Sequence, residues 1–555
     1  MDIQLFTVVS IIIDFLLIIY LFWLNRRILI EIVRSVSFRG KVILLLIILI
    51  FSVIVVFNGY NFKVFIPSDE EWELMRQAKN FLNGDQVLRY LRYGFVYPLL
   101  LSFGFIIFGI NPLVGSIMSF VFGVLSILLI FTISQLIFKN EKTSLVSSLL
   151  YSMSPLVYIF TSLQMGYPGL VNFFLLLFVL ASVLSFQKQK FSLFILSLIL
   201  IAFTAQIKPE YFVLIVPYLF GAILFWKERK INYLSIFILI TTFLILSAPY
   251  LLQNIYLKEG HSSGWCGDLS LVGRATFHSD WLSKYIDPVI KFVVNDRFSV
   301  NYLINKIPSL FQFWMFRSLA LITPIMIVGI FVALRKFTKM TIYILSIFFS
   351  ITFLYLADCY LYEARYAFPT FGLVVIFFGF GINYLISLID GGANIKQLVK
   401  KIILILFSVF LIIFLYFYEY RNSLFQGEYF DYLFTVRNVS SKSEYYSVVS
   451  TLLNKLPREN TFVVVPHPND KNMIMIMGYE SISLIDYVAF QTNETINYET
   501  VNIPLDFGKL NYFLELDSCN YSTIKEKCDF IKEKYSAEQL KTTDFGGSLY
   551  LLNSK

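Results

Sequence analysis

An acidic run at the start of a short amphipathic segment is the part of the sequence most able to do chemistry. In residues 67–85, Ser68 and Glu71 have capping-box spacing, and apolar residues mark one helical face at positions 74, 75, 78, 81 and 82. Asp69 and Glu70 then fall in the first turn, where a carboxylate could accept a proton from a hydroxyl. Alternatively, these acids only stabilise the helix start through its dipole. The helix is too short to span a bilayer, so we expect it to lie in a membrane interface.

The rest of the chain has the composition of a polytopic membrane protein. Of its 555 residues, 57% are hydrophobic and 15% charged, and the mean hydropathy is +0.71. Apolar residues come in runs of about twenty, the length of a helix that crosses a bilayer. Soluble domains carry about a quarter charged residues. These figures exclude a disordered chain, a coiled coil, a secreted disulfide scaffold and a transmembrane β-barrel, whose strands would alternate with a period of two.

The apolar runs predict about twelve membrane-spanning helices. They lie near residues 6–24, 42–60, 112–137, 143–163, 168–186, 191–207, 211–226, 232–252, 310–334, 340–357, 367–389 and 402–418. We expect Asp14, inside the first run, to face another helix, because a charge facing lipid is costly. The net charge of +8 comes from basic residues in short connections, within 26–41, 139–142, 188–190, 227–230, 335–339 and 396–401. This is the positive-inside pattern, with both termini outside, and it argues against nucleic acid, which needs a contiguous basic face.

The segments expected outside are residues 61–111, residues 253–309 and the tail after about residue 420. All four cysteines fall in outer segments, and an even count on the oxidising side fits disulfides. The natural pairs are Cys266–Cys359 and Cys519–Cys528, and four unrelated free thiols are the alternative.

The tail is polar and mixed, and it reads as a small α/β extracytoplasmic domain. We expect helices at 447–456 and 524–535, and strands at 461–465, 511–516 and 547–552. His467 is expected in a loop. The sequence has no Gly-rich phosphate loop, HExxH or CxxC motif. The predicted fold is therefore an all-α polytopic membrane protein with this domain at its C-terminal end, divided at residues 1–41, 42–420 and 421–555.

A second short apolar segment, from Tyr97 to Gly109, leads through a Phe-Gly-Ile-Asn-Pro turn into the next span. An acidic pair, an amphipathic helix with a central Ala78, a Tyr-Pro start and this turn follow one another in that order. In this the chain resembles the GT-C superfamily of polyprenyl-phosphate-sugar-dependent glycosyltransferases, in the branch of protein O-mannosyltransferases and the lipid A aminoarabinose transferase. The resemblance implies a GT-C-like catalytic core over residues 42–420, preceded by one extra transmembrane helix. It also implies that Asp69, with Glu70 beside it, is the catalytic acid.

Two further places agree with the resemblance. Lys208 lies in a break between two short apolar runs, and Arg365-Tyr366 opens the eleventh span from outside. The resemblance implies that both contact the lipid phosphate of the donor. Arg89 and Arg92 are weaker candidates, because headgroup contact explains them equally well. The alternatives are a snorkelling lysine at 208 and an interfacial anchor at 365–366.

One departure bears on metal dependence. Many GT-C members place a second acid near the position of residues 161–167, but this stretch has no carboxylate here. Glu210, Asp268 or Glu363 could substitute, so a divalent metal such as Mg or Mn remains open, and no other cofactor is expected.

The function implied is inverting transfer of a hexosyl or pentosyl group from a polyprenyl- or dolichyl-phosphate donor. The acceptor would be a protein, lipid or glycan of the cell envelope, at the extracytoplasmic face of the plasma membrane. A lipid-linked oligosaccharide polymerase or ligase is a variant of this reading. Two other classes stay open: a twelve-helix secondary transporter, and a non-catalytic protein with a degenerate transferase core. Carriers usually bind at the midplane between internal repeats, and the two halves of this chain show no convincing repeat.

Overall fold

The computed structural model describes most of the expected helices and the centre of the tail. The described residues are 3–62, 69–84, 95–110, 113–154, 157, 167–225, 241, 323–357, 364–390, 452–453, 456–457, 461–465, 480–483, 510–515, 519, 522–542 and 548–552. They divide into two compact units. The first comprises Met1–Asn58, Gln86–Leu99 and Ser116–Asp431, and the second comprises Gly59–Asp85, Leu100–Gly115 and Tyr432–Lys555. The three-part division expected from the sequence remains a prediction.

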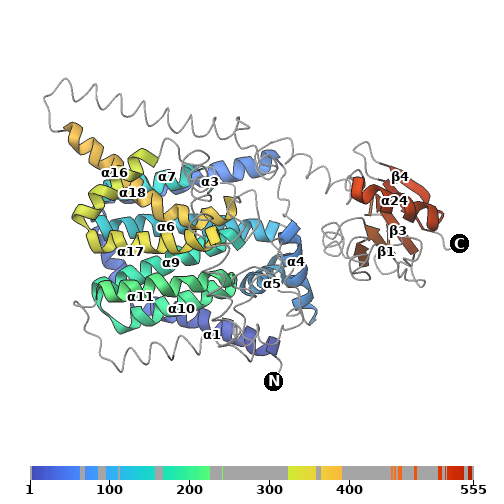
Figure 1. Ribbon diagram of the computed structural model, residues 1–555, viewed down its shortest axis with the longest axis horizontal. Coiled ribbons are helices and arrows are strands. Elements are labelled where there is room, and N and C mark those ends of the chain that lie inside the picture. Colours follow the sequence, from blue (N-terminus) through green and yellow to red (C-terminus); the bar gives the residue numbers. More distant parts are fainter. Residues whose placement is uncertain are drawn as a thin grey trace, which may run out of the picture. The chain divides into compact units, whose positions relative to one another are not determined.

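Long apolar runs, ended by polar and basic residues, form the helices of the first unit (Figure 1). In chain order they are α1 (Ile3–Leu24), α2 (Arg26–Ser35), α3 (Phe38–Phe62), α6 (Leu113–Phe138), α7 (Glu141–Met153), α9 (Tyr167–Lys188), α10 (Phe191–Ile207), the 3-10 helix η3 (Pro209–Leu214), α11 (Ile215–Leu224), α16 (Thr323–Lys336), α17 (Thr338–Ala357) and α18 (Ala364–Asp390). Four of the described helices are long and apolar enough to cross a membrane, or five if the bent pair α1–α2 is one span.

The chain is therefore an integral membrane protein, but the expected total of about twelve spans is not confirmed. The spans expected at 232–252 and 402–418 lie outside the described residues. The expected connection 26–41 contains the amphipathic helix α2, which the sequence analysis missed.

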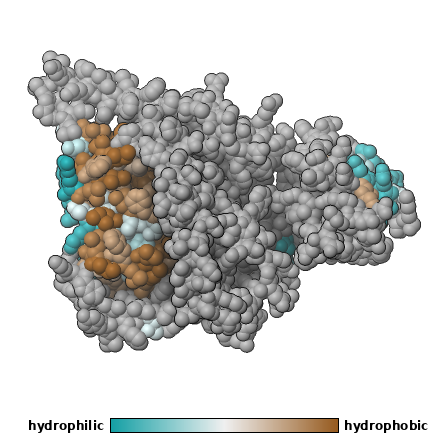
Figure 2. All heavy atoms as spheres, in the orientation of Figure 1, coloured by the Kyte–Doolittle hydropathy of each residue, from teal (hydrophilic) through white to brown (hydrophobic). Residues whose placement is uncertain are grey.

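Helix α9 lies at the centre of the first unit. Its apolar window Pro168–Lys188 is 94% buried, whereas Phe38–Val56 of α3 is only 22% buried and presents its side chains outward. Hydrophobic side chains cover one flank of this unit and hydrophilic ones lie at its edge, as expected where lipid surrounds the helices (Figure 2). Small residues let the helices approach closely, because apolar contact alone gives no preference for protein over lipid.

The basic connections of the first unit gather at one end of its helices. Asn25, after α1, bonds Ser192 at the start of α10, with its Nδ2 3.1 Å from the Ser192 Oγ. Ser37, before α3, donates from its backbone N and its Oγ to the Glu141 carboxylate at 2.8 and 2.7 Å. These two hydrogen bonds lower the pKa of Glu141.

Aromatic contacts extend this end to the remaining helices. Phe186, near the end of α9, stacks on Phe225 after α11 at a ring-centroid distance of 5.1 Å. Phe138, at the end of α6, packs edge-on against Phe337, in the turn between α16 and α17, at 5.5 Å. Lys339 lies over the Phe225 ring. The basic connections that the structure describes, within 26–41, 139–142, 188–190 and 335–339, therefore share one end of the first unit, which we call the basic end.

Two short helices, α4 (Asp69–Leu82) and α5 (Val96–Phe108), occur where the sequence predicts them. The apolar face of α4 is confirmed, since Leu74, Met75 and Ala78 are at most 1% exposed. Protein covers this face, and the expected location of α4 in a membrane interface remains a prediction.

The tail forms a five-stranded sheet with strand order β2-β1-β3-β5-β4. The strands are β1 (Thr461–Val465), β2 (Glu480–Ser483), β3 (Leu510–Glu515), β4 (Glu538–Thr542) and β5 (Ser548–Leu551), and the helix is α24 (Ser522–Lys534). β1 is parallel to β2 and β3, whereas β5 is antiparallel to β3 and β4. The predicted strands and second helix are confirmed. β2 and β4, at the two edges, were missed, and the helix expected at 447–456 lies largely outside the described residues.

Candidate functional site

The helical conformation is interrupted at Lys208 because proline follows this residue. Pro209 has no N–H to donate and disfavours helical dihedrals in the residue before it. Lys208 accordingly has φ −145° and ψ 113°, and its backbone N still donates to the Thr204 carbonyl at 3.0 Å. Tyr211 N donates back to the Lys208 carbonyl at 3.1 Å, which starts η3. The break that the sequence predicts is confirmed.

The side chain of Lys208 is 3% exposed. α10 starts after Lys190 at the basic end and runs for 17 residues, or roughly 25 Å at 1.5 Å per residue. Lys208 is thus a buried lysine at the end of α10, and this end is remote from the basic end.

Arg365 and Tyr366 occupy the first turn of α18. Near its end, Phe380 stacks on Phe138 at 4.3 Å, so α18 finishes at the basic end. Near its start, Phe371 stacks on Tyr151 at 6.1 Å. The opening turn of α18 is therefore at the end of the unit remote from the basic connections, as Lys208 is. The structure does not describe the side chains of Arg365 and Tyr366, and their contact with a phosphate remains a prediction.

The acids occupy the expected backbone positions. α4 begins with Asp69 and Glu70, which belong to the second unit, and their side chains lie outside what the structure describes. Their approach to Lys208 is thus a prediction. Four other candidate residues lie outside the described residues: Arg89, Arg92, Asp268 and Glu363. The backbone of Glu210 is described as part of η3, but its side chain is not.

Comparison with known proteins decides the fold. Residues 93–252 match the family model of dolichyl-phosphate-mannose-protein mannosyltransferases. ArnT from Cupriavidus metallidurans bound to undecaprenyl phosphate aligns over 93% of this chain and 98% of its own, with TM-score 0.55 and 11% identity. The resemblance to the GT-C superfamily is confirmed. The apo oligosaccharyltransferase of Archaeoglobus fulgidus, also a GT-C protein, aligns over 94% of this chain and 75% of its own, with TM-score 0.52 and 13% identity. No curated protein matches the sequence.

A metal site, which some GT-C proteins would suggest, finds no support among the described side chains. Within the described ranges, no three His, Cys, Asp or Glu residues lie together where they could hold a metal ion. The carboxylates that could do so are the candidate acids whose side chains are not described. A divalent metal therefore stays a prediction.

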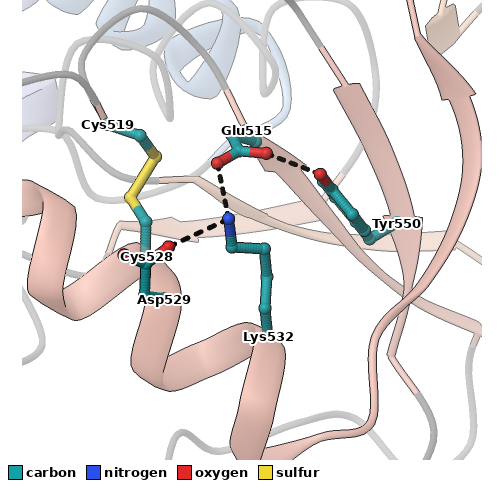
Figure 3. Close-up of polar contacts among 6 residues, drawn as sticks. All are labelled: Glu515, Cys519, Cys528, Asp529, Lys532 and Tyr550. Carbon is teal, nitrogen blue, oxygen red and sulfur yellow. Dashed lines mark hydrogen bonds and ion pairs between the residues drawn. A yellow bond between two sulfur atoms is a disulfide. The ribbon is translucent and has the colours of Figure 1, made fainter.

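The tail holds a polar cluster that the sequence did not reveal (Figure 3). Lys532 Nζ, on α24, lies 2.7 Å from Glu515 Oε1 at the end of β3 and 3.0 Å from Asp529 Oδ1. The Tyr550 hydroxyl donates to Glu515 Oε2 at 2.7 Å. Burial opposes the charge on Lys532, but the hydrogen bonds and charges of Glu515 and Asp529 outweigh it, so the pKa of Lys532 is raised.

The same region contains one of the two expected disulfides. Cys519 and Cys528 are bonded, with sulfurs 2.08 Å apart, and both are buried in the core between the sheet and α24. Both oxygens of Glu515 are engaged. The cluster and the disulfide together fasten α24 to β3, and we assign them a structural role. Cys266 and Cys359 lie outside the described residues.

Proposed function

We propose that this protein is a membrane glycosyltransferase that moves a sugar from a polyprenyl-phosphate-linked donor to an acceptor, with inversion at the anomeric carbon. The observation that carries the proposal is the buried Lys208 at the end of a broken helix, within a GT-C fold. A buried ammonium at this position is suited to an anionic headgroup, because charge-assisted bonds to phosphate are strong where water is partly excluded.

The basic end supports an orientation of the protein in the membrane. Cytoplasmic connections carry an excess of Lys and Arg, so we assign the basic end to the cytoplasm. Lys208 and the start of α18 are remote from that end, which supports our proposal that the phosphate contacts lie at the extracytoplasmic face of the plasma membrane. A nucleotide sugar made in the cytoplasm does not reach this face, whereas a lipid-linked sugar can be delivered there.

The donor would be held at its phosphate by Lys208 and Arg365, with Tyr366 beside them. Arg89 and Arg92 are secondary candidates for the same headgroup. The lipid tail would lie against apolar helix surfaces. The ArnT structure to which this chain is similar was determined with undecaprenyl phosphate bound, which is the chemistry proposed here for the donor carrier.

The transfer step would use Asp69 as the general base, with Glu70 beside it. The acceptor hydroxyl oxygen attacks the anomeric carbon from the side opposite the phosphate, and its proton passes to the Asp69 carboxylate. The bond from the anomeric carbon to the phosphate oxygen breaks, and polyprenyl phosphate leaves with the bonding electrons. Negative charge on that phosphate grows toward the transition state, so fixed cations stabilise it more than the ground state.

A transfer assay in proteoliposomes tests the proposal, with dolichyl-phosphate-mannose as the first donor and full-length protein throughout. Asp69→Asn should lower kcat by about 10²–10⁴-fold, the usual contribution of a general base. Lys208→Met should weaken donor binding by roughly 10- to 100-fold, because a charged hydrogen bond is worth about 1.5–3 kcal/mol. Lys190→Met, at the other end of α10, is the matched control and should leave transfer unchanged.

The competing classes give different results in the same vesicles. A transporter would move a labelled sugar across the bilayer without forming product, and a degenerate core would bind lipid phosphate but transfer nothing. Full activity of the Asp69→Asn protein would remove Asp69 from the mechanism.

A further inference from the structure

Helix α1, which the sequence predicts to precede the catalytic core, contacts α10 through two polar contacts, one near each end of α10. At the basic end, Asn25 bonds Ser192, as described above. Toward the other end, Gln206 Nε2 donates to Asp14 Oδ2 at 3.1 Å, across 192 residues of sequence. Between these contacts the surface is apolar, with the Phe15 and Phe203 rings 6.2 Å apart. Asp14 thus faces another helix, as expected from the sequence.

Stability alone does not explain an acid at this position. Asp14 is fully buried, and among the described residues nothing donates to its Oδ1. An aspartate at the centre of a membrane helix costs about 2.5–3.5 kcal/mol on insertion scales. Replacing a buried polar contact by well-packed apolar side chains is often neutral or stabilising. A leucine would therefore serve better if the only task were to dock α1.

The location of Gln206 suggests what the contact does. Gln206 lies in the last turn of α10, and Lys208 is the residue at which the helix ends and the chain turns extended. The direction of the Lys208 side chain depends on where that last turn stops and how it is rotated. A hydrogen bond that holds Gln206 holds this turn.

We propose that Asp14 is a positioning residue for the lipid-phosphate site: through Gln206 it fixes the end of α10, and so aims the Lys208 ammonium at the phosphate. This inference rests on the role given to Lys208 under Proposed function. It assigns to the extra helix α1 a part in donor binding, although Asp14 itself touches neither donor nor acceptor.

Binding of undecaprenyl phosphate to the full-length protein, titrated by native mass spectrometry, tests the inference without requiring activity. Asp14→Leu should weaken binding by about tenfold, the size of a coupling between contacting residues, while leaving thermal stability equal or higher. Asp14→Asn keeps an oxygen that can accept the hydrogen bond from Gln206, so this variant should bind undecaprenyl phosphate as the wild type does. Gln206→Met breaks the same hydrogen bond from the other helix and should match Asp14→Leu.

Asn25→Leu is the matched control, because it removes the other polar contact of α1, roughly 20 Å away along α10 at 1.5 Å per residue. It should leave binding unchanged. Equal losses in Asp14→Leu and Asn25→Leu would mean that α1 acts only as a scaffold and would overturn the inference. Unchanged binding in Asp14→Leu beside a loss in Lys208→Met would overturn it while sparing the proposed function. Unchanged binding in Lys208→Met would refute the phosphate contact itself, and the inference with it.

Discussion

A close backbone contact between α16 and α18 predicts a sharp difference between two glycines of α18. A Cβ added at Gly381 of α18 would overlap the backbone carbonyl oxygen of Ile325 in α16 and would lie 3.1 Å from the backbone nitrogen of Gly329. A Cβ at Gly372 would meet only methyl groups, of Ile130 and Leu176, each at 3.1 Å. Backbone atoms cannot move aside without separating the helices, whereas methyl groups can.

The expected magnitude combines two opposing terms. Alanine is favoured over glycine in a helix by about 1 kcal/mol, and this gain applies at both positions. Overpacking typically costs about 1–3 kcal/mol, and contact with backbone should bring Gly381→Ala to the upper end. We therefore expect Gly381→Ala to lose about 2 kcal/mol and Gly372→Ala to be near neutral or slightly stabilised. Gly329→Ala should resemble Gly381→Ala, and the two should not add, because they occupy one contact.

Unfolding in mixed micelles, titrated with SDS and followed by a fluorescent label on α18, measures these differences. Expression level and insertion of the two alanine variants should be equal before titration. If Gly381→Ala is as stable as Gly372→Ala, the backbones of α16 and α18 are not in contact and this part of the packing is wrong.

Three further outcomes are expected. Replacing Cys519 and Cys528 by serine should destabilise the C-terminal unit by about 2.5 kcal/mol for a nine-residue separation, read from hydrogen exchange of its sheet, and unchanged exchange would contradict it. The pKa of Lys532 is raised, so the ion pairs of its ammonium should stabilise the C-terminal unit fully below pH about 10. This stabilisation should be lost as the pH rises through the raised pKa of Lys532, and Lys532→Met should abolish this loss of stability at alkaline pH. The pKa of Glu141 is lowered, so its hydrogen bonds from Ser37 should hold above pH about 4.3 and weaken as the pH falls through the lowered value. Thiol labelling of a Phe38→Cys variant, which keeps Ser37 and places the probe at an exposed neighbouring position, can follow this change, and Glu141→Gln should remove the pH dependence.

Local sequence signals were sufficient where one residue dictates the backbone. Pro209 alone fixes the end of α10, and the apolar, β-branched run at 461–465 is sufficient to predict a strand. The edge strands β2 and β4 carry polar residues and pair on one side only, so they show no hydrophobic period. Helix α2 was not predicted because its arginines and its glutamate are typical of a polar connection between spans, although its apolar residues recur on one face.

Contacts between distant residues could not be read from one sequence. Nothing near Asp14 indicates that its partner is Gln206, and nothing near Glu515 indicates Lys532 and Tyr550. Such pairs depend on how helices and strands are arranged, which local periodicity does not encode. The GT-C resemblance supplied the order of the elements, but the burial of Lys208 came only from the structure.

The most direct test is a structure of the full-length protein in a lipid nanodisc with undecaprenyl phosphate. The phosphate should lie within charge-assisted hydrogen-bond distance of the Lys208 Nζ, near the first turn of α18 and remote from Lys190. A phosphate bound instead among the basic connections, with Lys208 contacting only protein, would contradict the assignment of this end of α10 as the donor site.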